Sequence, residues 1–110
     1  MFVAEPSAAP EIAELKVINS TSISVKWKPV PEQSTHGVIT HYTIYYTDKV
    51  KNNNLTWVVK APALEVTLNG LRQQAEYLFQ ILAATSKGDG PLSDPPKSAT
   101  TKGEENVNVV

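Results

Sequence analysis

The sequence predicts an all-β fold, a seven-stranded antiparallel β-sandwich of the immunoglobulin-like type. Short runs alternate apolar and polar residues, which is the period of half-buried strands, and no run has the period of a helix. Clusters of turn-forming residues separate these runs. The chain of 110 residues is long enough for one domain with a single core and too short for two.

The first two predicted strands are separated by the turn Asn19-Ser20-Thr21. Residues 10–17 begin with a proline, which suits an edge strand because no ladder donor is needed there. Residues 22–27 alternate strictly and place Ile23, Val25 and Trp27 on the inward face. We therefore expect an edge strand followed by a half-buried strand.

The next two predicted strands form a hairpin. Residues 38–46 carry Tyr42 and Tyr46 on one face. A polar loop over residues 48–54 contains three consecutive asparagines, which tolerate the positive φ of a tight connection. Residues 55–60 are the return strand of this hairpin.

The most apolar stretch predicts a central strand over residues 77–84. A short strand is predicted before it, over residues 64–68. Both sets of alternating residues in the central strand are largely apolar, so we expect one face to be deeply buried and the other partly covered. Leu71 precedes Tyr77 by six residues, as in a tyrosine corner, where a buried phenol bonds to a backbone group upstream. The last strand is expected over residues 97–101.

Composition limits the partners of the chain. A net charge of −1 gives no reason to expect attraction to nucleic acid or to an anionic membrane. No apolar run is long enough to span a bilayer, so no direct membrane insertion is expected. There is no cysteine, hence neither a disulfide nor a thiolate metal site. Residues 1–9 and 102–110 have the composition of linkers.

Several motifs together resemble a fibronectin type III domain. In chain order they are Trp27 followed by Pro29 and Pro31, the run Gly37-x-Ile39-x-x-Tyr42-x-Ile44-x-Tyr46, Leu71 to Tyr77, Phe79-x-Ile81-x-Ala83, and Gly88-x-Gly90-Pro91-x-Ser93. The match covers about residues 10–101, and Trp27, Tyr42, Leu71 and Tyr77 are its structural positions. Gln73, where the family often has proline, implies a slightly looser corner, and Thr85 stands where the family often has asparagine.

A narrower similarity links residues 86–95, together with residues 39–48, to type III repeats of neural receptors in the netrin receptor and neogenin group. The resemblance implies a non-catalytic spacer and protein-binding module in the extracellular part of a plasma-membrane receptor or adhesion protein. Its partners would be a protein ligand, such as a secreted guidance protein, and neighbouring domains of the same chain. An intracellular structural array of the muscle type and an accessory module of a secreted enzyme remain open.

The sequence offers no catalytic, cofactor-binding or metal-binding constellation. His36 and His41 are separated by a loop-to-strand junction, and neither has a carboxylate at a spacing typical of a metal site or a proton relay. The eleven carboxylates are scattered through loops and linkers. We therefore expect no enzyme activity and no cofactor.

Two acceptor sequons suggest glycosylation. Asn19-Ser20-Thr21 and Asn54-Leu55-Thr56 both fall in predicted turns, where an exposed asparagine is accessible to modification. A sequon is short and arises often by chance. Two of them favour the secretory pathway and make Asn19 and Asn54 candidate glycosylation sites.

Three further features are candidates for partner binding. Lys87, Gly88 and Asp89 resemble the adhesion tripeptides that some type III domains present to integrins, although glycines are also what this turn requires. Lys49, Lys51 and Lys60 would suit a sulfated glycan or an acidic partner, or would be ordinary edge-strand lysines. Trp57 either packs under the hairpin or stands out as an anchor.

Overall fold

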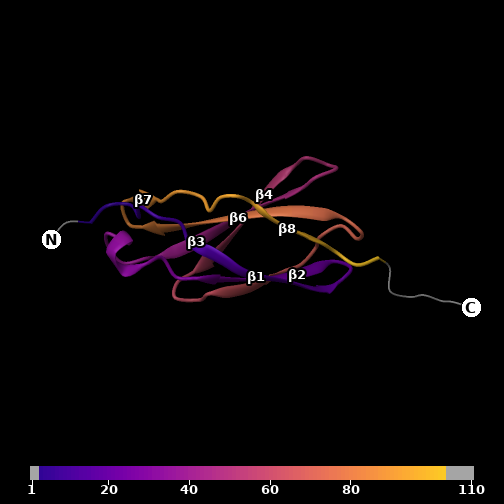
Figure 1. The fold of residues 1–110 in the computed structure, drawn as a ribbon, viewed down its shortest axis with the longest axis horizontal. Helices are drawn as coiled ribbons and strands as arrows, with labels where there is room; N and C mark the ends of the chain where they lie inside the picture. Colours follow the sequence, from indigo (N-terminus) through magenta and orange to yellow (C-terminus); the bar gives the residue numbers. More distant parts are fainter. Residues whose placement is uncertain (1–2, 104–110) are drawn as a thin grey trace, which may run out of the picture.

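The computed structural model describes residues 3–103 as two antiparallel sheets packed face to face (Figure 1). One sheet has the order β1-β2-β5, and the other has the order β4-β3-β6-β7 with β8 also paired to β6. The strands are β1 (Glu11–Asn19), β2 (Ser22–Lys28), β3 (His41–Asp48), β4 (Asn54–Lys60), β5 (Glu65–Leu68), β6 (Glu76–Thr85), β7 (Gly88–Asp89) and β8 (Lys97–Thr100). The predicted antiparallel sandwich is confirmed.

Residues 3–103 contain eight strands, whereas seven were predicted for the chain. The additional strand is β7, two residues that pair with the end of β6 through Ala84↔Asp89 and Thr85↔Gly88. Such a short bridge has no alternation to detect, so the sequence predicted only a loop there. A single 3-10 turn, η1 (Glu32–Ser34), also lies inside a segment predicted to be a polar loop.

The third strand begins later than predicted. β3 starts at His41, whereas the strand was expected from residue 38. Val38 is 81% exposed, and the backbone just before it has positive φ at His36 (55°) and Gly37 (151°). This turn occupies the place of the predicted strand start, and the chain reaches the sheet at Thr40, whose N–H donates to the Ala84 carbonyl (2.8 Å) and whose carbonyl accepts the Ala61 N–H (3.1 Å).

The core lies between the two sheets and is rich in aromatic rings. On β6, Phe79 and Ile81 are fully buried, and the opposite-parity Leu82 is buried as well, so both faces of the central strand are covered as expected. Tyr46 stacks against Phe79 with ring centroids 6.3 Å apart. Across the sandwich, Trp27 meets Tyr42 edge-on at 5.3 Å. These contacts confirm the predicted inward face of β2 and β3.

The tyrosine corner is present. The Arg72 N–H donates to the Tyr77 hydroxyl at 2.8 Å, five residues upstream of the ring. Leu71 is buried and its N–H donates to the Thr21 carbonyl at 3.0 Å. Gly70 provides the left-handed backbone (φ 73°) that turns the chain into this corner, a conformation that glycine adopts without steric cost.

The described part of the segment expected to be an N-terminal linker lies against the sandwich. Ala4 N–H donates to the His36 carbonyl and Ser7 N–H to the Ser34 carbonyl, both at 2.9 Å. The Thr85 hydroxyl donates to the Ala4 carbonyl at 2.8 Å. Composition alone gave no sign of these contacts. Residues 1–2 and 104–110, the outer parts of the two expected linkers, lie outside the described residues.

Candidate interaction surfaces

The loop between β3 and β4 is held in one conformation by Asp48. Its carboxylate accepts the N–H groups of Val50 (2.9 Å) and Lys51 (3.1 Å). The guanidinium of Arg72 donates to both oxygens, from Nε to Oδ2 at 2.8 Å and from Nη2 to Oδ1 at 3.1 Å. Asn52 adopts the positive φ (56°) expected of the asparagine run. The loop is therefore preorganised, and Figure 1 shows it projecting from the body of the sandwich.

The charge state of Asp48 follows from these contacts. Its side chain is only 3% exposed. The bidentate bond from Arg72, assisted by the backbone N–H groups of Lys51 and Val50, holds the pKa of Asp48 well below its usual range, against the effect of desolvation. The same contact raises the pKa of Arg72. The local sequence pattern does not reveal this pair. Its one local signal was an aspartate opening the polar loop.

The three candidate lysines do not form one patch. The Lys49 ammonium lies 3.4 Å from a Glu76 carboxylate oxygen, and Lys51 is exposed on the same loop. Lys60 lies opposite His41 at the other end of β4, roughly 20 Å away along the strand. Between Lys49 and Lys51, Val50 is 76% exposed. In the sequence of the loop, an exposed aliphatic side chain therefore lies between two lysines, of which Lys49 is paired with Glu76.

Trp57 packs inward. It is half-buried against the core cluster, on the same side of β4 as Val59. The residue between them, Val58, points outward and is 62% exposed. Between the two alternatives that the sequence left open, the structure places the indole under the hairpin.

The Lys87-Gly88-Asp89 tripeptide comprises the last residue of the tight turn after β6 and the two residues of β7. Lys87 N–H donates to the Thr85 hydroxyl at 3.2 Å, while Gly88 and Asp89 belong to the ladder with β6. Lys87 and Asp89 are both exposed. This turn lies at the opposite end of β6 from the β3–β4 loop, since Asp48 pairs with Tyr77 and His41 with Ala84. The two loops therefore cannot form a single site.

Both sequon asparagines are exposed at strand ends that border turns. Asn19 ends β1, and its side-chain oxygen accepts the Thr21 N–H at 2.9 Å. Asn54 begins β4, and its side-chain oxygen accepts the Thr47 hydroxyl at 2.8 Å. Either side chain is accessible from solvent, and glycan occupancy remains a prediction.

The two histidines make separate local contacts. His36 Nε2 lies 3.0 Å from the Ser7 hydroxyl, and His41 Nδ1 lies 3.0 Å from the Thr40 hydroxyl. Over residues 3–103, no three His, Asp or Glu side chains converge as metal ligands. No helix in this part of the chain is long and apolar enough to cross a membrane.

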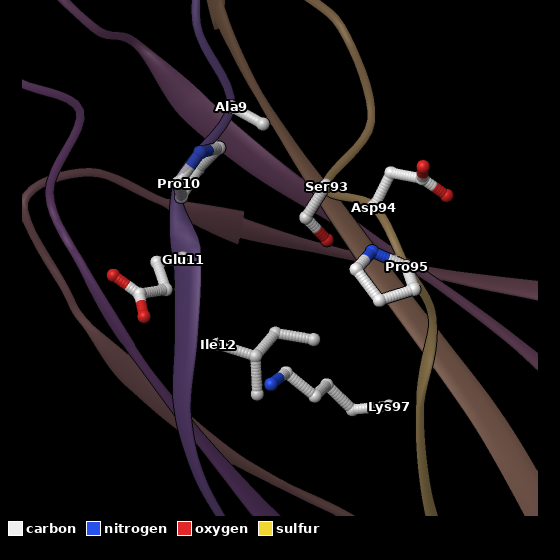
Figure 2. A pocket seen from close by; sticks show the side chains of 8 residues that line it. All are labelled: Ala9, Pro10, Glu11, Ile12, Ser93, Asp94, Pro95 and Lys97. Atoms are coloured by element: carbon white, nitrogen blue, oxygen red, sulfur yellow. The ribbon is translucent and has the colours of Figure 1, made fainter.

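A shallow groove of about 330 Å³ separates the start of β1 from the segment that leads into β8 (Figure 2). In Figure 2 the Lys97 side chain extends toward Ile12, and the Asp94 carboxylate points away from the groove. Glu11 pairs with Lys28 at 3.9 Å, and the Ser93 hydroxyl accepts the Ile81 N–H. Glu11 and Ser93 thus bond to other parts of the fold, and the polar groups of the groove do not converge on a common point.

These observations define a β-sandwich module with exposed loops and an unpaired strand edge within residues 3–103. The chain belongs to the fibronectin type III family, since the model of the Fibronectin type III domain matches residues 8–99. The resemblance noted in the sequence is thereby confirmed.

Several receptor proteins contain similar segments. Neogenin from Rattus norvegicus is 38% identical over 90 residues, covering 81% of this chain and 6% of that protein. A Lar-like tyrosine-protein phosphatase from Caenorhabditis elegans is 35% identical (90% of this chain, 5% of that protein). Human Protein sidekick-1 is 34% identical (91% and 5%). The chain therefore spans only about a twentieth of the length of these curated relatives.

Solved structures agree with this assignment. The third fibronectin III domain of human KIAA0343 protein superposes with a TM-score of 0.85 at 25% identity, covering 96% of this chain and 90% of that one. The FN5 domain of Drosophila Lar gives 0.71 at 31% identity, covering 90% and 99%. Fibronectin type III domains are generally non-catalytic modules.

Proposed function

We propose that the chain is an extracellular spacer and protein-binding module of a multidomain cell-surface receptor or adhesion protein, with axon guidance as the setting. The observation that carries the proposal is the similarity to neogenin, sidekick-1 and Lar-like phosphatase segments over 81–91% of this chain. Each relative is far longer than this chain, as expected for proteins that string many modules together.

The shape of the domain supports a spacer role. The described chain begins and ends at opposite ends of the long axis (Figure 1), so flanking modules would continue in a row. Residues 3–9 are hydrogen-bonded to the sandwich near one end. This contact would fix the direction in which a preceding module joins and so set the angle between neighbours.

Two loops support a binding role. The preorganised β3–β4 loop presents Val50 between Lys49 and Lys51, which suits an acidic protein surface, or a sulfated glycan through the lysines alone. The exposed Lys87 and Asp89 form the candidate adhesion turn at the other end. No chemistry is performed at either place.

Glycan occupancy is the experiment that tests the extracellular setting. The segment, expressed with its native neighbours in a secretory mammalian cell, is expected to carry a glycan at Asn19, Asn54 or both, because both side chains are exposed. Site-resolved mass spectrometry measures this occupancy, with Asn19→Gln and Asn54→Gln as controls. If both sites stayed bare in a folded, secreted product, the intracellular array of the muscle type would become the better proposal.

A further inference from the structure

β4 is an edge strand whose outer side has no partner strand. It ends the sheet order β4-β3-β6-β7, and over residues 3–103 no other strand pairs with it. Antiparallel edges of this kind offer rows of backbone donors and acceptors to another strand.

The ladder identifies which backbone groups face the free edge. Ala61 N–H donates to the Thr40 carbonyl at 3.1 Å, in the pair that continues the β3–β4 register. Hydrogen-bonded and non-hydrogen-bonded pairs alternate along an antiparallel ladder, so every second residue before Ala61 also faces β3. The residues whose N–H and C=O groups face outward are therefore Asn54, Thr56, Val58 and Lys60. The Lys60 carbonyl fits this direction, since it accepts the Ala63 N–H in the following turn (3.3 Å).

β4 has little of the protection that natural edge strands carry. It pairs with β3 over seven residues without a bulge, contains no proline, and has a single charged residue, Lys60, at its end. Its side chains are mostly apolar, with Leu55 40% and Val58 62% exposed. In contrast, the other sheet carries Lys26 with Glu14 and Glu65 across its outer face.

We propose that β4 pairs with β4 of a second copy of this chain, antiparallel about a two-fold axis at Trp57. This is the register that pairs all four outward-facing residues: Thr56 with Val58 of the second copy, and Asn54 with its Lys60. It sets no like charges opposite each other. The two five-stranded sheets then join edge to edge into one continuous sheet, a homophilic contact that goes beyond the proposed spacer role.

The inward-facing residues of β4 favour a second copy as the occupant. The same axis sets Trp57 against Trp57 and Leu55 against Val59 of the second copy, so every contact on that side is apolar. These side chains are half-buried or exposed in the single chain and lose further apolar surface in the pair. In this register the pattern of β4 is therefore complementary to itself.

Sedimentation velocity tests the pairing on the chain expressed without glycans in bacteria. The chain should show concentration-dependent doubling of its mass between micromolar and millimolar concentrations. The double variant Thr56→Lys/Val58→Lys sets ammonium against ammonium in both central pairs and should weaken association at least about tenfold. The variant Thr56→Glu/Val58→Lys sets carboxylate against ammonium in the same pairs and should restore it.

The controls distinguish association in this register from nonspecific association. Thr67 is exposed on β5, the edge of the other sheet, so Thr67→Lys should leave association unchanged. Unfolding midpoints by circular dichroism show that each variant is folded. A chain that stays monomeric throughout, a charge-swapped variant that stays monomeric, or loss of association in Thr67→Lys would each overturn the proposal. None of these results bears on glycan occupancy at Asn19, so the proposed function is tested separately; a glycan at Asn54 would lie at the end of the paired strands and is absent from the bacterially expressed chain.

Discussion

Arg72 connects three parts of the domain through three of its groups. Its N–H donates to the Tyr77 hydroxyl, its guanidinium donates to Asp48, and its carbonyl accepts the Thr101 hydroxyl at 2.7 Å. The tyrosine corner, the β3–β4 loop and the residue after β8 are thus joined at one position. The Gln73 departure from the family pattern leaves the corner hydrogen bond at an ordinary length of 2.8 Å.

The depressed pKa of Asp48 predicts how stability depends on pH. The folded pKa lies below the ordinary value of about 3.9. The stabilisation is therefore complete above the unfolded pKa and is lost as pH falls from about 5 through the folded pKa. The variant Asp48→Asn should show a lower unfolding midpoint at pH 7 and a shallower loss of stability on acidification. Urea unfolding at a series of pH values measures both.

Asp94→Asn is the matched control for this prediction. Asp94 is exposed and, within residues 3–103, makes no side-chain hydrogen bond or ion pair. Its substitution should leave the loss of unfolding free energy on acidification unchanged. If the Asp48→Asn variant lost stability on acidification as steeply as the original chain, the Arg72 contact would not set the pH dependence.

At the scale of elements, residues 3–9 contact the segment that follows β7. This contact depends on Gly90. A Cβ added there would lie 2.9 Å from both Cβ and the carbonyl oxygen of Pro6, and 3.2 Å from the Ala83 carbonyl oxygen. Two of these contacts are with backbone atoms that cannot easily move. Gly90→Ala should therefore displace the N-terminal segment and cost about 1–3 kcal/mol of unfolding free energy.

Hydrogen exchange gives a local measurement of that displacement. The N–H groups of Ala4 and Ser7 should exchange faster in Gly90→Ala, because their bonds to residues 36 and 34 depend on the position of the segment. Ser86→Ala, an exposed change in the neighbouring turn, should leave both rates unchanged. Equal exchange rates in Gly90→Ala and the original chain would show that the segment is held without Pro6.

At the scale of the whole molecule, one aromatic core must hold both sheets because the chain has no cysteine. Phe79 is fully buried between them, and Phe79→Ala should cost ~3–5 kcal/mol and shift the whole transition together. Val58→Ala, on the exposed side of β4, should change stability by less than about 0.5 kcal/mol. Separate transitions for the two sheets in urea would contradict a single cooperative core.

The sequence by itself determined the sandwich and most of its strands. The side chains that face inward could be predicted because burial of one face of a strand imposes a period of two. Residues 22–27 alternate strictly, and residues 77–84 are apolar on both faces of the strand. The corner formed by Leu71 and Tyr77 was also readable, since a buried phenol requires a partner close in the chain. These features depend on local spacing.

Only the tertiary structure decided the features that join distant residues. The Arg72 contact with Asp48, the docking of residues 3–9 against residues 34, 36 and 85, and the separation of Lys60 from Lys49 have no counterpart in local pattern. The free edge of β4 likewise follows from strand order in space. Alternation reports which face of a strand is buried, whereas partners across loops and edges depend on how the two sheets bring remote segments together.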